Sequence, residues 1–152
     1  MRVALDTNIL AYAEGVNGSV RKKLALDLLQ QLPQDSVVLP VQALGELFHV
    51  LVRKAGWSPS KARATILSWQ DAFPIVETSI VVMLAATDLA ADHRLSIWDA
   101  VIFSAAAEGG CRLLLSEDLH DGFTWNGVTV SNPFADSTHP LLRALLSSKN
   151  AE

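Results

Sequence analysis

The sequence contains a single cysteine, Cys111, and only 18% of its residues are charged. One cysteine excludes an intrachain disulfide, so we expect the protein in a reducing cytoplasm. With four scattered histidines it also forms no structural zinc pattern. The longest wholly apolar run, Ile80 to Ala86, is far too short to cross a membrane. The N-terminus has no basic segment followed by an apolar one, so we expect no signal peptide.

An excess of positive charge is also absent. The formal net charge is −4, whereas nucleic-acid-binding proteins usually carry a basic surface. The basic residues gather in two groups, at residues 21–23 and 53–63, which we interpret as solvated faces. The net charge does not exclude nucleic-acid binding, because an acidic metal site would itself supply several of the negative charges.

Hydrophobic residues, by contrast, make up half of the 152 residues, enough for one domain with a buried core. We expect a single domain over residues 1–152, with its core at about 2–134 and a C-terminal helix at about 138–148. Hydrophobic periodicity, prolines and candidate caps such as Ser19, Ser58 and Ser96 predict strands that alternate with helices. Such alternation is typical of an α/β fold with a mostly parallel sheet.

Polar residues follow two of the predicted strands directly. Asp6 comes after the first strand, and Ser116 and Asp118 come after "CRLLL". The carboxyl ends of parallel strands lie at one edge of a sheet, where α/β proteins bind ligands. These side chains could therefore share a site, or each could cap the helix or turn that follows it.

A third acid lies inside the helix predicted after the second strand. The polar residues of this helix fall at steps of four, three and four and so form one stripe: Gln42, Glu46, His49 and Arg53. The stripe is either a solvated surface or the wall of a groove. In the second case Glu46 would face a metal, and His49 and Arg53 would line a candidate substrate groove beyond it.

The fourth acid, Asp99, lies three residues after Ser96 at the start of a predicted helix. Ser-x-x-Asp is similar to a capping box, so the role of Asp99 could be structural. We expect its neighbours Ile97, Trp98, Ala100 and Val101 to be buried. An acid held among them at a helix N-terminus could instead hold a cation.

Four segments taken together resemble a known family. "LDTNIL", "ALGELFHVL", "SIWDAVIFSAA" and "LLLSEDL" are similar, in order and rough spacing, to the motifs of PIN-domain ribonucleases, especially the VapC-type toxins of toxin–antitoxin pairs. The resemblance extends from Arg2 to Phe134. It implies a PIN-like three-layer α/β/α fold, with a mostly parallel central sheet flanked by helices.

The resemblance also implies site residues. The acidic quartet of the family corresponds to Asp6, Glu46, Asp99 and Asp118. Its supporting polar positions correspond to Asn8 and Ser116. We expect three of the acids, Asp6, Asp99 and Asp118, to contact Mg²⁺ or Mn²⁺ directly or through water, with Glu46 completing the shell or orienting the attacking water. Two neighbouring acids, Glu117 and Asp121, could join through water.

The implied activity is metal-dependent hydrolysis of RNA phosphodiester bonds, by the toxin of a type II toxin–antitoxin system. The resemblance further implies a structured RNA such as tRNA as substrate, a small antitoxin encoded beside the toxin, and a homodimer. One alternative is a non-catalytic RNA- or protein-binding module on the same fold. Another is phosphoryl transfer with Asp6 as nucleophile, although the related phosphatases have a second Asp where Asn8 stands.

Aromatic residues offer candidate contacts for these partners. Trp57, Trp69 and Phe73 lie on or near one predicted helix and could serve the antitoxin, a second subunit or the core. Trp125 lies in a polar segment predicted as a turn, and is a candidate for base stacking or partner binding.

Overall fold

Six strands form one sheet in the computed structural model, which describes residues 1–150. They are β1 (Arg2–Leu5), β2 (Val37–Pro40), β3 (Ile75–Val76), β4 (Cys111–Leu115), β5 (Thr124–Trp125) and β6 (Val128–Ser131). Their order in the sheet is β3-β2-β1-β4-β6-β5, and all neighbouring strands are parallel except β5 and β6. The predicted α/β fold with a mostly parallel sheet is confirmed.

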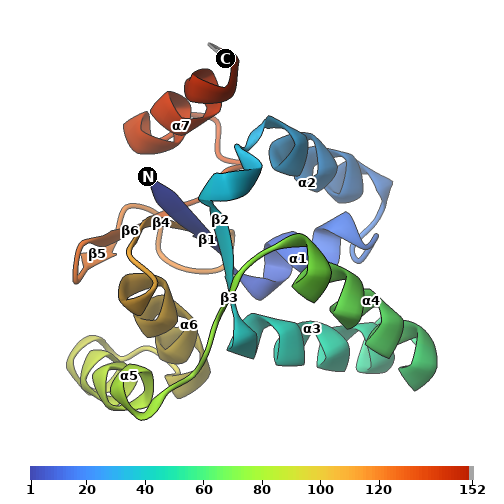
Figure 1. Cartoon of the computed structure of the whole chain (residues 1–152), viewed down its shortest axis with the longest axis horizontal. Coiled ribbons are helices and arrows are strands. Elements are labelled where there is room, and N and C mark those ends of the chain that lie inside the picture. Colours follow the sequence, from blue (N-terminus) through green and yellow to red (C-terminus); the bar gives the residue numbers. More distant parts are fainter. Residues whose placement is uncertain (151–152) are drawn as a thin grey trace.

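Helices α1 to α4 form one group around these strands and α5 with α6 form another, while α7 lies apart from both (Figure 1). The helices are α1 (Thr7–Ala13), α2 (Ser19–Gln31), α3 (Val41–Arg53), α4 (Pro59–Ala72), α5 (Ile80–His93), α6 (Ile97–Glu108) and α7 (Pro140–Asn150), with a 3₁₀ turn η1 (Gln34–Ser36) before β2. Within residues 1–150 none of them has the length and apolar character that a membrane span requires.

Serine caps begin several helices. The hydroxyls of Ser58 and Ser96 each accept a hydrogen bond from the backbone N–H three residues further on, at 3.2 and 3.1 Å, as predicted. The predicted Ser19 cap is wrong, because Ser19 is the first residue of α2 and Gly18 precedes it as the N-cap. Gly18 has φ 100°, a conformation that glycine adopts without strain.

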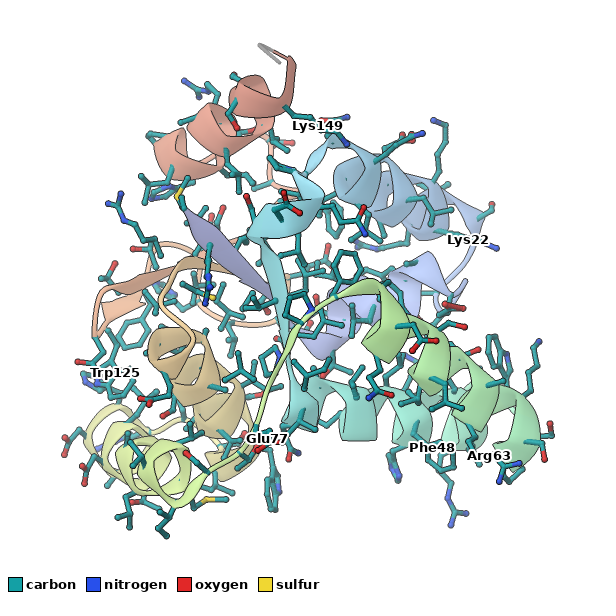
Figure 2. All side chains as sticks on the ribbon, viewed as in Figure 1. Lys22, Phe48, Arg63, Glu77, Trp125 and Lys149 are labelled. Carbon is teal, nitrogen blue, oxygen red and sulfur yellow. The ribbon has the colours of Figure 1, made fainter. Side chains whose placement is uncertain are left out.

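Two short elements lie where the sequence predicted none. Helix α1 is buried along nearly its whole length, so it shows no amphipathic period that would reveal a helix. Strand β5 pairs with β6 in the segment interpreted as a polar turn. Its Trp125 is half-buried, with its ring centroid 5.9 Å from that of Phe103, at the outer edge of the sheet (Figure 2).

The aromatic residues near α4 belong to the core. Trp69 is buried, stacks on Phe73 with ring centroids 6.0 Å apart, and donates a hydrogen bond from Nε1 to Oε1 of Glu14 at 3.2 Å. Trp57 is half-buried, and Nζ of Lys61 lies 3.8 Å from its ring centroid. Of the roles left open for these aromatic residues, core packing is therefore the one that the structure supports.

The register of β1 and β4 determines where the site forms. Leu5, the last residue of β1, pairs with Leu115, the last residue of β4. The backbone N–H of Asp6 then donates to the carbonyl oxygen of Leu115 at 2.9 Å. Asp6 and Ser116 thus emerge at the same edge of the sheet, as the sequence predicted.

Candidate functional site

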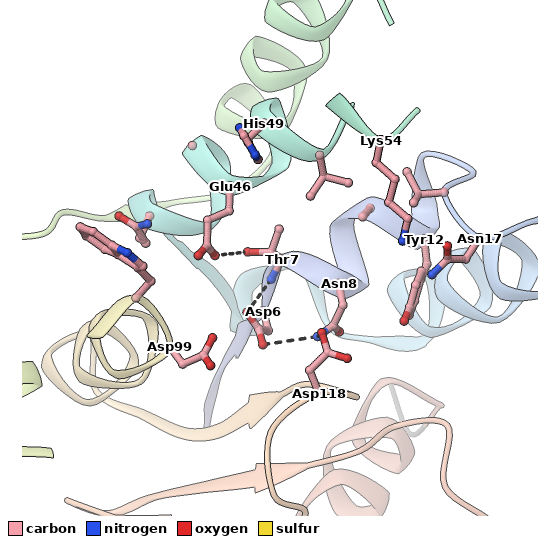
Figure 3. Close-up of a pocket in the computed structure, with 16 residues that line it drawn as sticks. Asp6, Thr7, Asn8, Tyr12, Asn17, Glu46, His49, Lys54, Asp99 and Asp118 are labelled. Carbon is pink, nitrogen blue, oxygen red and sulfur yellow. Dashed lines mark hydrogen bonds between the residues drawn. The ribbon is translucent and has the colours of Figure 1, made fainter. Parts of the chain in front are cut away.

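A cavity of about 670 Å³ lies beyond this edge. It lies between α1, α3 and the first turn of α6, with the loop after β4 along one side (Figure 3). Side chains of four acids from separate parts of the chain line it: Asp6, Glu46, Asp99 and Asp118. The structure therefore brings together all four members of the predicted quartet.

Asp6 has both of the roles that the sequence left open. It is the N-cap of α1, since its Oδ1 accepts a hydrogen bond from the backbone N–H of Thr7 at 2.7 Å. Its second oxygen, Oδ2, accepts from the hydroxyl of Ser116 at 2.7 Å. The side chain also lines the cavity while the residue is only 5% exposed. Capping therefore orients a carboxylate that remains available to a ligand.

Asn8 and Ser116 hold two of the acids together. The Asn8 amide nitrogen Nδ2 lies 3.4 Å from Oδ2 of Asp6, 3.2 Å from Oγ of Ser116 and 3.1 Å from Oδ2 of Asp118. The amide oxygen accepts a hydrogen bond from the backbone N–H of Glu117 at 3.3 Å. The amide orientation is thereby determined, with its donor side toward the carboxylates.

Glu46 is held by a residue that sequence reasoning missed. The hydroxyl of Thr7 donates to Oε2 of Glu46 at 2.7 Å, linking the start of α1 to the second turn of α3. Thr7 directly follows Asp6 in the motif "LDTNIL", and this position was the only sign in the sequence that it belongs to the site. Asp99 lies in the first turn of α6. Its backbone N–H donates a hydrogen bond to the Ser96 hydroxyl, and its side chain lines the cavity.

The two neighbouring acids have other partners. The carboxylate of Glu117 forms an ion pair with Arg21 on α2, and its Oε1 accepts a hydrogen bond from the Tyr12 hydroxyl at 2.9 Å. Asp121 accepts a hydrogen bond from the backbone N–H of Asn132 at 2.9 Å. Neither lines the cavity, whereas Asp118 does.

The candidate groove contains His49 but not Arg53. The cavity turns at the end of α3 toward Val16 and Asn17, and on this side it is Lys54 that lines the wall. Figure 3 shows Lys54 near Tyr12 and Asn17. The prediction for Arg53 is therefore not supported by the geometry, because helix periodicity gives the direction of a side chain but not the path of a cavity.

Burial raises the pKa of two of the four acids, Asp6 and Glu46. Burial, aided by the negative charges of Asp99 and Glu46, raises the pKa of Asp6 from 3.8 to about 6, although hydrogen bonds from Ser116 and Thr7 lower it. Burial, followed by the charge of Asp99, also raises the pKa of Glu46. Each carboxylate is therefore costly to ionise without a cation nearby.

The donor set suits a hard divalent cation. Carboxylate oxygens are the ligands that Mg²⁺ and Mn²⁺ prefer, and Mg²⁺ commonly binds through one or two carboxylates while it keeps several waters. Among the described residues, no three acidic, histidine or cysteine side chains are already close enough to hold one ion. An ion held by fewer of these side chains would keep water among its ligands.

Comparison with known proteins agrees with this geometry. Residues 3–120 match the family model of the PIN domain. The chain belongs to the PIN-domain family. The predicted family resemblance is thus confirmed, and the sheet with its flanking helices is the PIN fold. No curated protein matches this PIN domain in sequence.

Solved structures similar to this PIN domain include a VapC toxin and a toxin–antitoxin complex. VapC20 of Mycobacterium tuberculosis, a sarcin–ricin loop cleaving toxin, is 21% identical, with a TM-score of 0.63 over 74% of this chain and 86% of that one. A toxin–antitoxin complex from Klebsiella pneumoniae is 20% identical, with a TM-score of 0.65 over 87% and 98% of the two chains. FitAcB from Neisseria gonorrhoeae is 17% identical, with a TM-score of 0.65 and the same coverage.

Proposed function

We propose that this PIN domain is a metal-dependent endoribonuclease, and the toxin of a type II toxin–antitoxin system. The observation that carries the proposal is the convergence of four carboxylates on one open cavity in a PIN fold. The VapC members of the family are in general nucleases. We propose structured RNA, such as tRNA, as substrate, cut at unpaired nucleotides.

Each side chain has a part in this chemistry. Asp6, Asp99 and Asp118 hold Mg²⁺ or Mn²⁺ directly or through water. Glu46, oriented by Thr7, completes this shell or positions the attacking water. A bound divalent cation would supply positive charge toward the phosphate and lower the pKa of water. Asn8 and Ser116 keep the carboxylates in the required orientation.

The first test is cleavage of total RNA by the purified protein in Mg²⁺, in Mn²⁺ and in chelator. Asp6→Asn and Asp99→Asn, purified in the same way, control for contaminating nucleases. We expect defined fragments that need metal and that both variants fail to produce. Cleavage that persists in chelator or in both variants would contradict the proposal. A folded wild type without cleavage and without thermal stabilisation by either ion would favour a binding module.

The toxin role has its own test. Induced expression of the wild type in a bacterial host is expected to arrest growth, and Asp6→Asn is expected not to. We propose that a small antitoxin, encoded beside the toxin, inserts a segment into the cavity and blocks RNA. Coexpression of that neighbouring protein should restore growth and, after purification of the complex, suppress cleavage. Growth arrest by both forms would contradict the role.

We also propose a homodimer. Exposed apolar residues gather at the N-terminal end of α5, where Ile80, Val81 and Leu84 are 70%, 57% and 59% exposed. Such a cluster favours an interface between subunits, because burying it removes apolar surface from water. Sedimentation of the wild type and of Val81→Glu with Leu84→Glu tests the dimer. We expect the double variant to be monomeric.

A further inference from the structure

Trp98 is exposed, although the sequence predicted it to be buried, and its neighbour Ile97 is half-buried. The exposed fraction of Trp98 is 52%, while Ala100 and Val101 are fully buried. Its position in the first turn of α6 turns the indole away from the core. An indole presents a large planar apolar face, so an exposed one can pack flat against another ring.

Trp98 lines the same cavity as the four acids. It directly precedes Asp99, and the volume of the cavity is about 670 Å³. Gln42, Glu46 and His49 of helix α3 line this cavity as well. A planar apolar surface therefore lies beside the carboxylates, within the volume where the proposed substrate would bind.

Trp98 is separate from the exposed apolar end of α5. The hydroxyl of Ser104 donates to the carbonyl oxygen of Val82 at 2.9 Å, so this part of α6 lies beside the start of α5. A short connection joins the two helices, which therefore run in opposite directions. Trp98 lies roughly 9 Å along α6 from Ser104, at a rise of about 1.5 Å per residue, and toward the other end of α5.

We propose that Trp98 is a base-stacking residue, on which a nucleobase next to the scissile phosphate packs. This inference rests on the proposed ribonuclease function and adds a substrate contact to it. The acids repel phosphate until a cation neutralises them, whereas the face of a base carries no net charge. Stacking on an indole thus adds RNA affinity at an acidic site, and it tolerates any base because every base has such a face.

The experiment compares two single-stranded oligoribonucleotides of about a dozen nucleotides. One has all its bases, and the other has abasic riboses throughout. Both carry fluorescein, and their binding to the full chain in Ca²⁺ is followed by fluorescence anisotropy, with intact probe verified on a gel. We expect the wild type to prefer the base-bearing RNA by about tenfold or more. Trp98→Ala should lose most of this preference, and Trp98→Phe should keep part of it.

A matched control is available on α4. Leu67 is also 52% exposed, and it lies outside the cavity, so Leu67→Ala should bind both probes as the wild type does. For cleavage of the base-bearing RNA, Trp98→Ala should raise KM while the Mn²⁺ concentration at half-maximal rate stays unchanged. The unchanged metal requirement separates stacking from damage to Asp99.

Two outcomes would overturn the inference. Unchanged preference for the base-bearing RNA in Trp98→Ala would show that the indole does not stack on bases, and the ribonuclease function would still stand if Asp6→Asn lost cleavage. Unchanged preference together with altered sedimentation would assign Trp98 to a protein interface instead. Failure of the proposed function itself is distinct, because the wild type would then show no metal-dependent cleavage of either total RNA or the probe.

Discussion

The hydroxyl of Ser116 donates a hydrogen bond to Oδ2 of Asp6 at 2.7 Å, across 110 residues of sequence. The same hydroxyl accepts hydrogen bonds from the backbone N–H groups of Asp118 and Leu119, at 3.1 and 3.2 Å. The loop that carries Asp118 is therefore linked, through Ser116, to the side chain of Asp6 just after β1. Two members of the acidic quartet thus form one hydrogen-bonded unit, and a change at either end is expected to be felt at the other.

Asp6→Asn is expected to make the stability of the metal-free protein less dependent on pH. The pKa of Asp6 is raised from 3.8 to about 6, so between these values the folded state keeps a proton that the unfolded state has released. The contribution of Asp6 to the free energy of unfolding is therefore present below pH 3.8 and is lost as pH rises through about 6. A shift of this size corresponds to roughly 3 kcal/mol. Urea unfolding in chelator across this range, for both proteins, measures the difference. If the free energy of unfolding changed with pH in the same way for both proteins, this prediction would be wrong.

Asn8→Ala is expected to weaken metal binding by about 10- to 100-fold, the usual effect of removing a residue that orients metal ligands. The Asn8 amide is a donor shared by Asp6, Ser116 and Asp118, so its loss frees the carboxylates to turn away from each other. Thermal unfolding at increasing Mn²⁺ measures the apparent affinity. Exposed Gln70→Ala on α4 is the surface control. If Asn8→Ala reached half of its thermal stabilisation at the same Mn²⁺ concentration as the wild type, the amide would not orient the metal ligands.

Glu117→Gln is expected to leave the metal requirement of cleavage unchanged. Arg21 and Tyr12 hold the Glu117 carboxylate outside the cavity, whereas Asp118 faces into it. The loss of a partly exposed ion pair should lower the free energy of unfolding by about 1 kcal/mol or less. Asp118→Asn is the matched comparison and should require more Mn²⁺ for the same rate. Equal shifts in the two variants would place Glu117 in the site.

Two substitutions of Gly45 are expected to affect different properties, one the stability of the protein and the other the access of RNA to the cavity. A Cβ at this position would meet no atom within 4 Å, and Gly45 lines the cavity within α3. Gly45→Ala is therefore expected to stabilise the protein by about 0.5–1 kcal/mol through helix propensity. Gly45→Leu fills part of the cavity and should reduce RNA cleavage, while stabilisation by Mn²⁺ persists. Full cleavage by Gly45→Leu would show that RNA does not pass this wall.

Most of the helices and strands, and the sheet edge at which Asp6 and Asp118 meet, could be predicted from the amino-acid pattern alone. Proline and serine signals at residues such as Ser58 and Ser96 act within one helical turn, so they can be interpreted without knowledge of the fold. Asp6 and Ser116 could be placed at one edge because parallel strands bring their carboxyl ends together whatever their separation in sequence. Helix α1 escaped prediction because it is buried on all sides and lacks a period.

The surroundings of individual side chains could not be predicted from the sequence, because they depend on how the elements pack. Glu117 and Asp118 are adjacent acids, and the sequence offers no way to know that Arg21 binds the first from another helix. The exposure of Trp98 likewise depends on what packs against the first turn of α6. Hydrogen bonds, burial and the resulting pKa of Asp6 arise from groups distant in sequence, and their effects exist only once packing has brought those groups within a few ångströms.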